Sequence, residues 1–485
     1  MKKSLLVCLL FLATIKVFGQ RFAQYNTGSL YDSFENPSQR AFIPDTTKQF
    51  AFNFLIPNFD ANLLLTGNGQ EALKTRLFNN YYNTANLVTG QHAYNRFNVN
   101  ANVYTIMLKV FTSEDGDQEM GVSLNTRAEA RGTATDESIA FFNGTTNFPA
   151  NSYANVFNDN LSYQAYHQLS FTYREQVTRR LAIGFKFSAL AGLAYRKIDI
   201  DQSSVTFNKN ADQAMLYLSG TNYASNQKGE STAEKAFPFL TNPGASVSIG
   251  TTYLDESGFK WQGNIKNLGF IRWSGKSYIS TFSGSTLINN FSSAQREDII
   301  THSLDSLTTG SNKNKSFVSP TNGLLELSIN KTWWLNDDGY LKFSPTLIGS
   351  KELFYNGFTA ALVAPLQFGT RSIALTTTYD ELKAANLGFQ YMSKSENSEF
   401  FIGSERLLST VNFIHTATQG TLDNKSQLKT PATSFTGLDF YIGVSFKFGQ
   451  LIERRMNSSR IGPAGDKGFF GKIWDGMFGK KDPNY

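Results

Sequence analysis

Residue types that commonly carry out chemistry are few in this sequence and widely separated. The acidic stretch 114–117 (Glu-Asp-Gly-Asp) has the ligands of a weak calcium site, but a tight turn explains its composition better. Barrel lipases use a serine and a histidine that face lipid, and only His167 lies near a predicted strand. We therefore predict no enzyme, no metal site and no cofactor. The histidines, none of them at metal-binding spacing, are His92, His167, His302 and His415.

Amide and charged side chains instead recur at every second position of two neighbouring segments. In 97–103, asparagines alternate with apolar residues, and in 122–131, charged residues do so. This period of two predicts strands with one polar face. That face would contact water in a soluble sandwich and the lumen in a barrel. An arginine facing lipid at mid-bilayer costs ~2–4 kcal/mol, which favours the lumen. The predicted lumen-facing residues are Asn98, Asn100, Asn102, Asn125, Arg127, Glu129 and Arg131.

The elements that must position these side chains follow the same pattern along the chain. Charged residues make up 17% and aromatic residues 14%, and no later segment is a continuous apolar helix, so a membrane role requires a closed barrel. Alternating segments recur from 50–56 to 438–448, about 14 in all, with 12 or 16 left open, and their connections alternate between short and long. We therefore predict an all-β, transmembrane antiparallel β-barrel with periplasmic termini, rather than a soluble sandwich.

The N-terminus has the features of a secretory signal peptide. Lys2 and Lys3 precede the mostly apolar stretch 4–17, and we place cleavage after Gly19. Cleavage would remove Cys8, the only cysteine, and would lower the formal charge from +6 to +3, which is too weak to argue for nucleic acid. The expected divisions are a signal peptide (1–19), an N-terminal luminal segment (20–47), the barrel (48–448) and a periplasmic tail (449–485).

Several short motifs add a family resemblance. Asn36-Pro37-Ser38 precedes the first predicted strand, and the stretches 388–391, 401–404 and 441–448 combine glycine with aromatic residues. In these features the chain resembles the FadL-like barrels, which include hydrocarbon and fatty-acid transporters and the PorV-like proteins of Bacteroidota secretion. Their motif is Asn-Pro-Ala, so the third position departs here. The resemblance covers residues 20–450 and implies 14 strands and a hatch that tucks into the lumen.

The 37 residues after Phe448 carry a net charge of +3 and an apolar stripe at helical spacing. Glycines interrupt the stripe and weaken a helix. The tail is expected to lie in the membrane interface, to dock on a periplasmic partner, or to be disordered. The predicted docking residues are Phe470, Ile473, Trp474, Met477 and Phe478.

Two hypotheses for function follow. The first is a scaffold or accessory subunit of an outer-membrane secretion or barrel-assembly complex, which docks a protein partner through its extracellular loops or its tail. The alternative is a FadL-like passive transporter of small hydrophobic molecules. Both hypotheses place the protein in the outer membrane, in contact with its lipid, and neither involves nucleic acid.

Two long loops are also expected to contain short helices, over 71–78 and 294–307.

Overall fold

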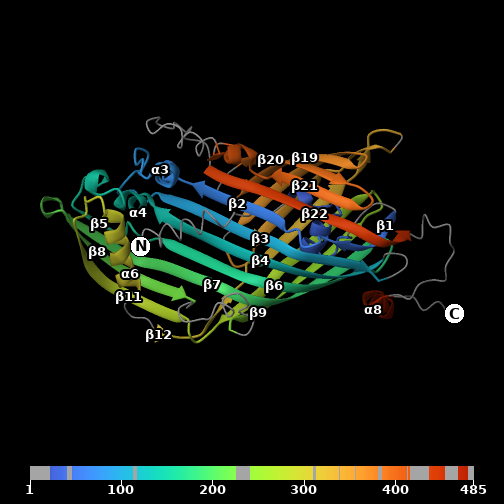
Figure 1. Ribbon diagram of the computed structural model, residues 1–485, viewed down its shortest axis with the longest axis horizontal. Coiled ribbons are helices and arrows are strands. Elements are labelled where there is room, and N and C mark those ends of the chain that lie inside the picture. Colours follow the sequence, from blue (N-terminus) through green and yellow to red (C-terminus); the bar gives the residue numbers. More distant parts are fainter. Residues whose placement is uncertain are drawn as a thin grey trace.

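The computed structural model shows one antiparallel sheet that closes on itself (Figure 1). The first and last barrel strands pair, from Thr46 opposite Glu453 to Leu65 opposite Thr436. The predicted barrel fold is thereby confirmed, with bounds slightly wider than the expected 48–448. The described residues are 22–40, 46–112, 117–225, 241–309, 313–337, 339–355, 357–380, 385–411, 413–414, 436–453 and 468–478. The predicted signal peptide lies outside them.

Fourteen barrel strands can be followed in the described part of the chain, each paired with its neighbours in chain order. Two short strands together make the first, eighth and ninth of them. In order they are β1 (Thr46–Phe52) with β2 (Asn58–Thr66), β3 (Tyr94–Phe111), β4 (Gln118–Thr135), β6 (Asn160–Gln176), β7 (Leu181–Asn208), β9 (Pro243–Leu254), β10 (Phe259–Trp273), β13 (Phe317–Pro320) with β14 (Leu324–Lys331), β16 (Leu341–Phe343) with β17 (Thr346–Glu352), β18 (Phe358–Phe368), β19 (Arg371–Asp380), β20 (Ala385–Lys394), β21 (Ser398–Ser404) and β22 (Thr436–Glu453).

Alternation along each strand separates an apolar outer face from a polar inner face. On β4, Val122 is exposed on the outside, whereas Ser123 and Asn125 are buried inside. On β7, Phe187 is exposed and Lys186 is buried. Because exposed apolar side chains recur around the whole wall, the outer surface matches a lipid environment rather than water.

The first barrel strand departs from the prediction, which ran continuously through 50–56. It is interrupted between β1 and β2, where Phe54 and Leu55 adopt left-handed φ angles of 48° and 61°. Asn53 replaces the missing backbone pairing, because its side chain donates to the carbonyls of Ile56 and Thr105 and accepts from Met107 N–H. The alternation of apolar residues continues through the interruption, so the pattern alone does not reveal it.

One end of the barrel extends beyond the rim. β7 continues past its pairing with β9 and pairs with β8 (Gln213–Ala224), which pairs with β11 (Tyr278–Asn289). The sequence had placed loops here, because these strands lie between barrel strands along the chain. The smaller elements at this end are α3 (Gln70–Asn79), α4 (Asp136–Phe141), η2 (Thr145–Asn147), β5 (Ser152–Ala154), η3 (Lys209–Ala211), α6 (Arg296–Thr309) and β12 (Lys313–Asn314), while β15 (Trp333–Trp334) lies at the other end.

The extension has its own apolar core, in which Phe141, Phe207 and Phe291 pack together. Helices α3 and α6 confirm the two helices expected in long loops, and Arg76 of α3 forms an ion pair with Glu297 of α6 at 2.5 Å. Figure 1 places these helices at the opposite end from the start of β1. The described parts of the long connections therefore lie over one mouth of the barrel. Among the described residues, no helix is long and apolar enough to span a membrane.

The tail contains one described helix, α8 (Phe469–Phe478), beside the outer wall at the short-turn end (Figure 1). Phe470 stacks on Phe185 of β7, with ring centroids 4.9 Å apart, and contacts Tyr173 of β6. The barrel wall itself thus covers Phe470, and the expected docking of the tail on a periplasmic partner or on the membrane stays a prediction. Ile473 is exposed, and the side chains of Trp474, Met477 and Phe478 lie outside the described residues.

Candidate functional site

Residues 22–40, called here the luminal segment, lie inside the barrel. The segment begins with η1 (Phe22–Gln24) and continues into α2 (Leu30–Glu35). Ser29 caps α2 by accepting the N–H of Asp32 through its side chain. Nearly every residue of the segment is buried, although it is short and contains only these two turns of helix. The wall strands therefore supply its surroundings.

The middle of the luminal segment is held by apolar contacts. Leu30 and Phe34 are fully buried, and Tyr31 packs edge-on against Tyr104 of β3 with ring centroids 5.6 Å apart. These side chains form a single core cluster with wall residues that include Phe401 of β21. Burial of one large apolar side chain contributes ~1.5–3 kcal/mol. Residues 30–34, the anchored part, are therefore costly to remove from the lumen.

A charged group follows directly. Glu35 contacts Arg127 and the hydroxyl of Tyr104, both at 2.6 Å, and Asn102 at 3.2 Å. Burial alone would raise the pKa of Glu35, but the positive charges of Arg127 and Lys186 hold it well below its ordinary value. The carboxylate therefore stays ionised and bonded to β3 and β4.

Residues 36–40, the polar part, are held by hydrogen bonds and ion pairs. Ser38 Oγ lies 2.8 Å from Thr252 Oγ1 on β9, and Arg174 of β6 donates to the Ser38 carbonyl at 2.9 Å. Lys260 of β10 donates to Gln39, and Arg40 lies 3.6 Å from Asp117, which precedes β4. A neutral hydrogen bond contributes ~0.5–1.5 kcal/mol net and one with a charged partner ~1.5–3 kcal/mol, and water can replace both kinds. The polar part is therefore the part of the segment that water entering the lumen can release.

Two paired glycines let the polar part approach the wall. Gly184 of β7 lies opposite Gly250 of β9. A side chain at Gly184 would begin 2.0 Å from the Pro37 carbonyl oxygen, and one at Gly250 would begin 3.0 Å from the Ser38 nitrogen. Asn36 is fixed nearby by Asn264 of β10 at 3.1 Å. The predicted hatch motif, Asn36-Pro37-Ser38, thus lies against a wall patch that has no side chains.

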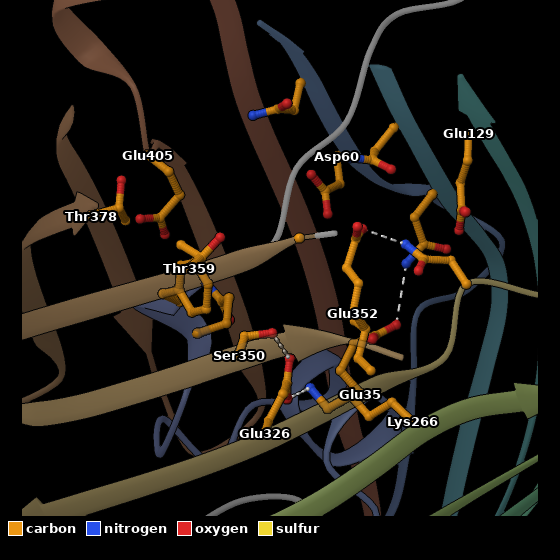
Figure 2. A pocket seen from close by; sticks show the side chains of 18 of the residues that line it. Glu35, Asp60, Glu129, Lys266, Glu326, Ser350, Glu352, Thr359, Thr378 and Glu405 are labelled. Carbon is orange, nitrogen blue, oxygen red and sulfur yellow. Dashed lines mark hydrogen bonds and ion pairs between the residues drawn. The ribbon is translucent and has the colours of Figure 1, made fainter. Parts of the chain in front are cut away.

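Beside the segment is a cavity of about 150 Å³ (Figure 2). Phe22, Tyr25 and Tyr31 of the segment contribute aromatic surface, and Leu64 and Leu324 of the wall add apolar surface. The charged lining is strongly unequal among the described residues, with eight carboxylates against three basic groups. The carboxylates are Asp32, Glu35, Asp60, Glu129, Glu326, Glu352, Asp380 and Glu405, and the basic groups are Arg127, Lys266 and Arg406.

Several of these charges bond across the lumen. Lys266 of β10 lies 2.5 Å from Glu326 of β14, which also accepts the hydroxyl of Tyr25. Glu405, after β21, accepts the N–H of Ala23 at 2.9 Å, while its second oxygen makes no hydrogen bond. Figure 2 shows Glu405 and Glu129 on opposite sides of the cavity. The cavity lining therefore contains more carboxyl groups than basic groups.

The structure brings most of the predicted lumen-facing residues together. Asn125 donates to Asn102 at 2.8 Å, and Arg131 forms a two-fold contact with Glu352 at 2.5 and 3.0 Å. The others line the cavity directly, namely Asn98, Asn100, Asn102, Arg127 and Glu129.

Sequence reasoning missed the acidic partners, because they lie far along the chain from β3 and β4. Glu326 did carry a signal, since it occupies a polar position of an alternating segment, whereas Glu35 and Glu405 lie outside such segments. Among the described residues, no cluster of three or more histidine, cysteine or acidic side chains is arranged to hold a metal ion.

A protein-family model described as "Family of unknown function (DUF5723)" matches residues 41–405. No curated protein matches the chain. Among solved structures, the chain is similar to the P. putida toluene transporter TodX, at 9% identity over 87% of this chain and 95% of that one, with a TM-score of 0.40.

It is also similar to the Ralstonia pickettii toluene transporter TbuX, at 10% identity over 90% of this chain and 97% of that one, with a TM-score of 0.39. A third similar structure is a Pseudomonas aeruginosa FadL homologue, at 10% identity over 88% of this chain and 96% of that one, with a TM-score of 0.40. At these identities and TM-scores, the similarities do not indicate which molecule this barrel binds or transports.

Proposed function

This chain belongs to the family of unknown function DUF5723, and we propose that it is a passive transport barrel of the outer membrane whose lumen its own luminal segment closes. The carrying observation is the unequal attachment of that segment. Residues 30–34 are held by apolar burial, while 36–40 are held by polar contacts that water can replace. Movement of the polar part alone would open a path past α2. The anchored part would stay in place and bring the polar part back to the wall.

The position of the polar part indicates which mouth of the barrel it closes. Arg40 of the polar part contacts Asp117, beside the short connection between β3 and β4. Bacterial barrels place short turns in the periplasm and long loops outside. We therefore propose that the long connections face outward, that both termini are periplasmic, and that the polar part closes the periplasmic exit.

The cavity favours a particular cargo. Its aromatic and aliphatic surface suits an apolar group, and its excess of carboxylates favours a neutral or cationic polar group over an anion. We propose small amphipathic molecules, a class that narrows the small hydrophobic cargo expected from the sequence. TodX and TbuX are described as toluene transporters, and toluene has no such polar group.

Three matched solutes test this proposal in proteoliposomes: phenethylamine as the cation, 2-phenylethanol as the neutral molecule and 3-phenylpropanoate as the anion. Protein-dependent uptake of the cation is expected to exceed that of the anion about tenfold, as charged linings typically bias the local concentration of solutes. Protein-free liposomes give the background, because the neutral solute also crosses lipid. Equal protein-dependent uptake of cation and anion would refute the cargo class, and none for all three would refute transport.

The scaffold hypothesis and the PorV-like resemblance stay predictions. The main sequence feature in favour of a scaffold was the apolar stripe of the tail. Phe470 of that stripe packs on the barrel's own wall, so it no longer requires a protein partner. A partner on the extracellular loops stays a prediction as well.

A further inference from the structure

An acidic residue lies on the outer face of β6, where its neighbours are apolar. Alternation places Glu175 on the same face as Leu169 and Phe171, each of which is 45% exposed. Glu175 itself is only 2% exposed, because α8 covers it. A carboxylate buried at an apolar surface is costly unless hydrogen bonds satisfy it.

Helix α8 supplies those hydrogen bonds. The N–H groups of Phe470 and Gly471 donate to the two Glu175 oxygens at 2.8 and 2.7 Å, and the Tyr173 hydroxyl donates at 2.8 Å. The first N–H groups of a helix lack partners within the helix and lie at its positive end, so the carboxylate and the helix satisfy each other. A side chain at Gly468 would begin 2.5 Å from the Glu175 carboxyl carbon, so this approach requires glycine.

Aromatic rings continue from the wall onto the helix. Phe187 stacks on Phe185 at 6.2 Å, Phe185 stacks on Phe470 at 4.9 Å, and Phe470 contacts Phe469 at 5.2 Å. The two ends of this row are both exposed, Phe187 by 56% and Phe469 by 64%. Phe187 belongs to the apolar outer wall. Phe469 therefore extends that apolar surface from β7 onto α8.

We propose that α8 is an interfacial helix that Glu175 clamps to the outer wall, and that its exposed side chains contact membrane lipid at the short-turn end of the barrel. We infer lipid as the partner of these side chains because the exposed residues Phe469 and Ile473 continue the lipid-facing surface of β7. Lys472 lies exposed between them, where an ammonium would meet anionic headgroups. The clamp fixes the tail at one side of the barrel, at β6 and β7.

A spin label tests the contact of α8 with lipid. In a Cys8→Ala background the chain has no cysteine, so Phe469→Cys can be labelled alone in vesicles of phosphatidylethanolamine and phosphatidylglycerol. We expect the label to collide with oxygen more than with an aqueous nickel chelate, as a label on Phe171→Cys in the wall does. A label that water reaches freely, or one shielded from both reagents, would overturn the lipid assignment.

Substitutions then test the role of Glu175. Gly468→Val changes the tail and none of the barrel strands, whereas Glu175→Leu replaces the carboxylate on the wall by an apolar side chain. Each is expected to shift the docked-to-undocked ratio of α8 about tenfold toward undocked, as loss of a charged cap does. The label should become mobile and water-accessible. Gly349→Val in β17, where no atom lies within 4 Å of a side chain built at that position, is the matched control and should leave the label docked. An unchanged label in both test variants would overturn the clamp.

Discussion

A disulfide between Ser38→Cys and Thr252→Cys is expected to stop solute uptake, and reduction is expected to restore it. The two side chains approach to 2.8 Å between their oxygens, one on the polar part of the luminal segment and the other on β9. A covalent link at this point keeps the polar part against the wall. Because passage requires that part to move, uptake of phenethylamine should fall about tenfold or more, as it does when a gating step is blocked.

The single variants Ser38→Cys and Thr252→Cys are the controls, since each removes one hydroxyl without forming a link. They should transport at rates close to the unmodified protein, with or without reductant. If the oxidised double variant still transports at that rate, the solute does not pass the polar part, and the proposed gate is wrong.

The substitution Gly184→Val is expected to have the opposite effect and to open the barrel. Its side chain would begin 2.0 Å from the Pro37 carbonyl oxygen, so the polar part cannot keep its position. Overpacking of this kind costs ~1–3 kcal/mol, and each ~1.4 kcal/mol corresponds to a tenfold change in population. Basal ion conductance in planar bilayers should therefore rise about tenfold, because displaced residues 36–40 no longer close the exit.

Gly349→Val in β17 is the matched control. No atom lies within 4 Å of a side chain built at Gly349, and this position alternates with the inner-facing Ile348 and Ser350. The same change in size and strand propensity is made there without touching the luminal segment. A Gly184→Val barrel that stays folded and conducts no more than the Gly349→Val barrel would show that the polar part does not limit conductance.

The fold could be predicted from the sequence because a period of two, continued over a whole strand, has few physical causes. Asn125 and Arg127 alternate with Leu124 and Thr126, which places their side chains on one face, and the cost of an arginine in lipid makes that face the inner one. The interruption at Phe54 and Leu55 could not be predicted, because Asn53 replaces backbone hydrogen bonds without changing the apolar pattern.

The site was predictable only in part. The segment around Pro37 was recognised from a motif, and β3 and β4 from their polar face. Their partners depend on which strands meet across the lumen, which local periodicity does not determine. Glu35 and Arg127, or Arg131 and Glu352, become neighbours only after closure of the barrel. The contact of the tail with the wall could not be predicted for the same reason, since Phe470 finds its partner on β7 of the same chain.

The most direct test of the gate is the alkylation rate of Ser38→Cys compared with Ser33→Cys, each in the Cys8→Ala background. Both positions are almost fully buried, but Ser33 belongs to the anchored part and Ser38 to the polar part. With iodoacetamide in excess, added phenethylamine is predicted to accelerate alkylation at position 38 and to leave position 33 protected, because only the polar part opens locally. Equal rates at position 38 with and without solute, or parallel acceleration at both positions, would contradict a gate formed by residues 36–40.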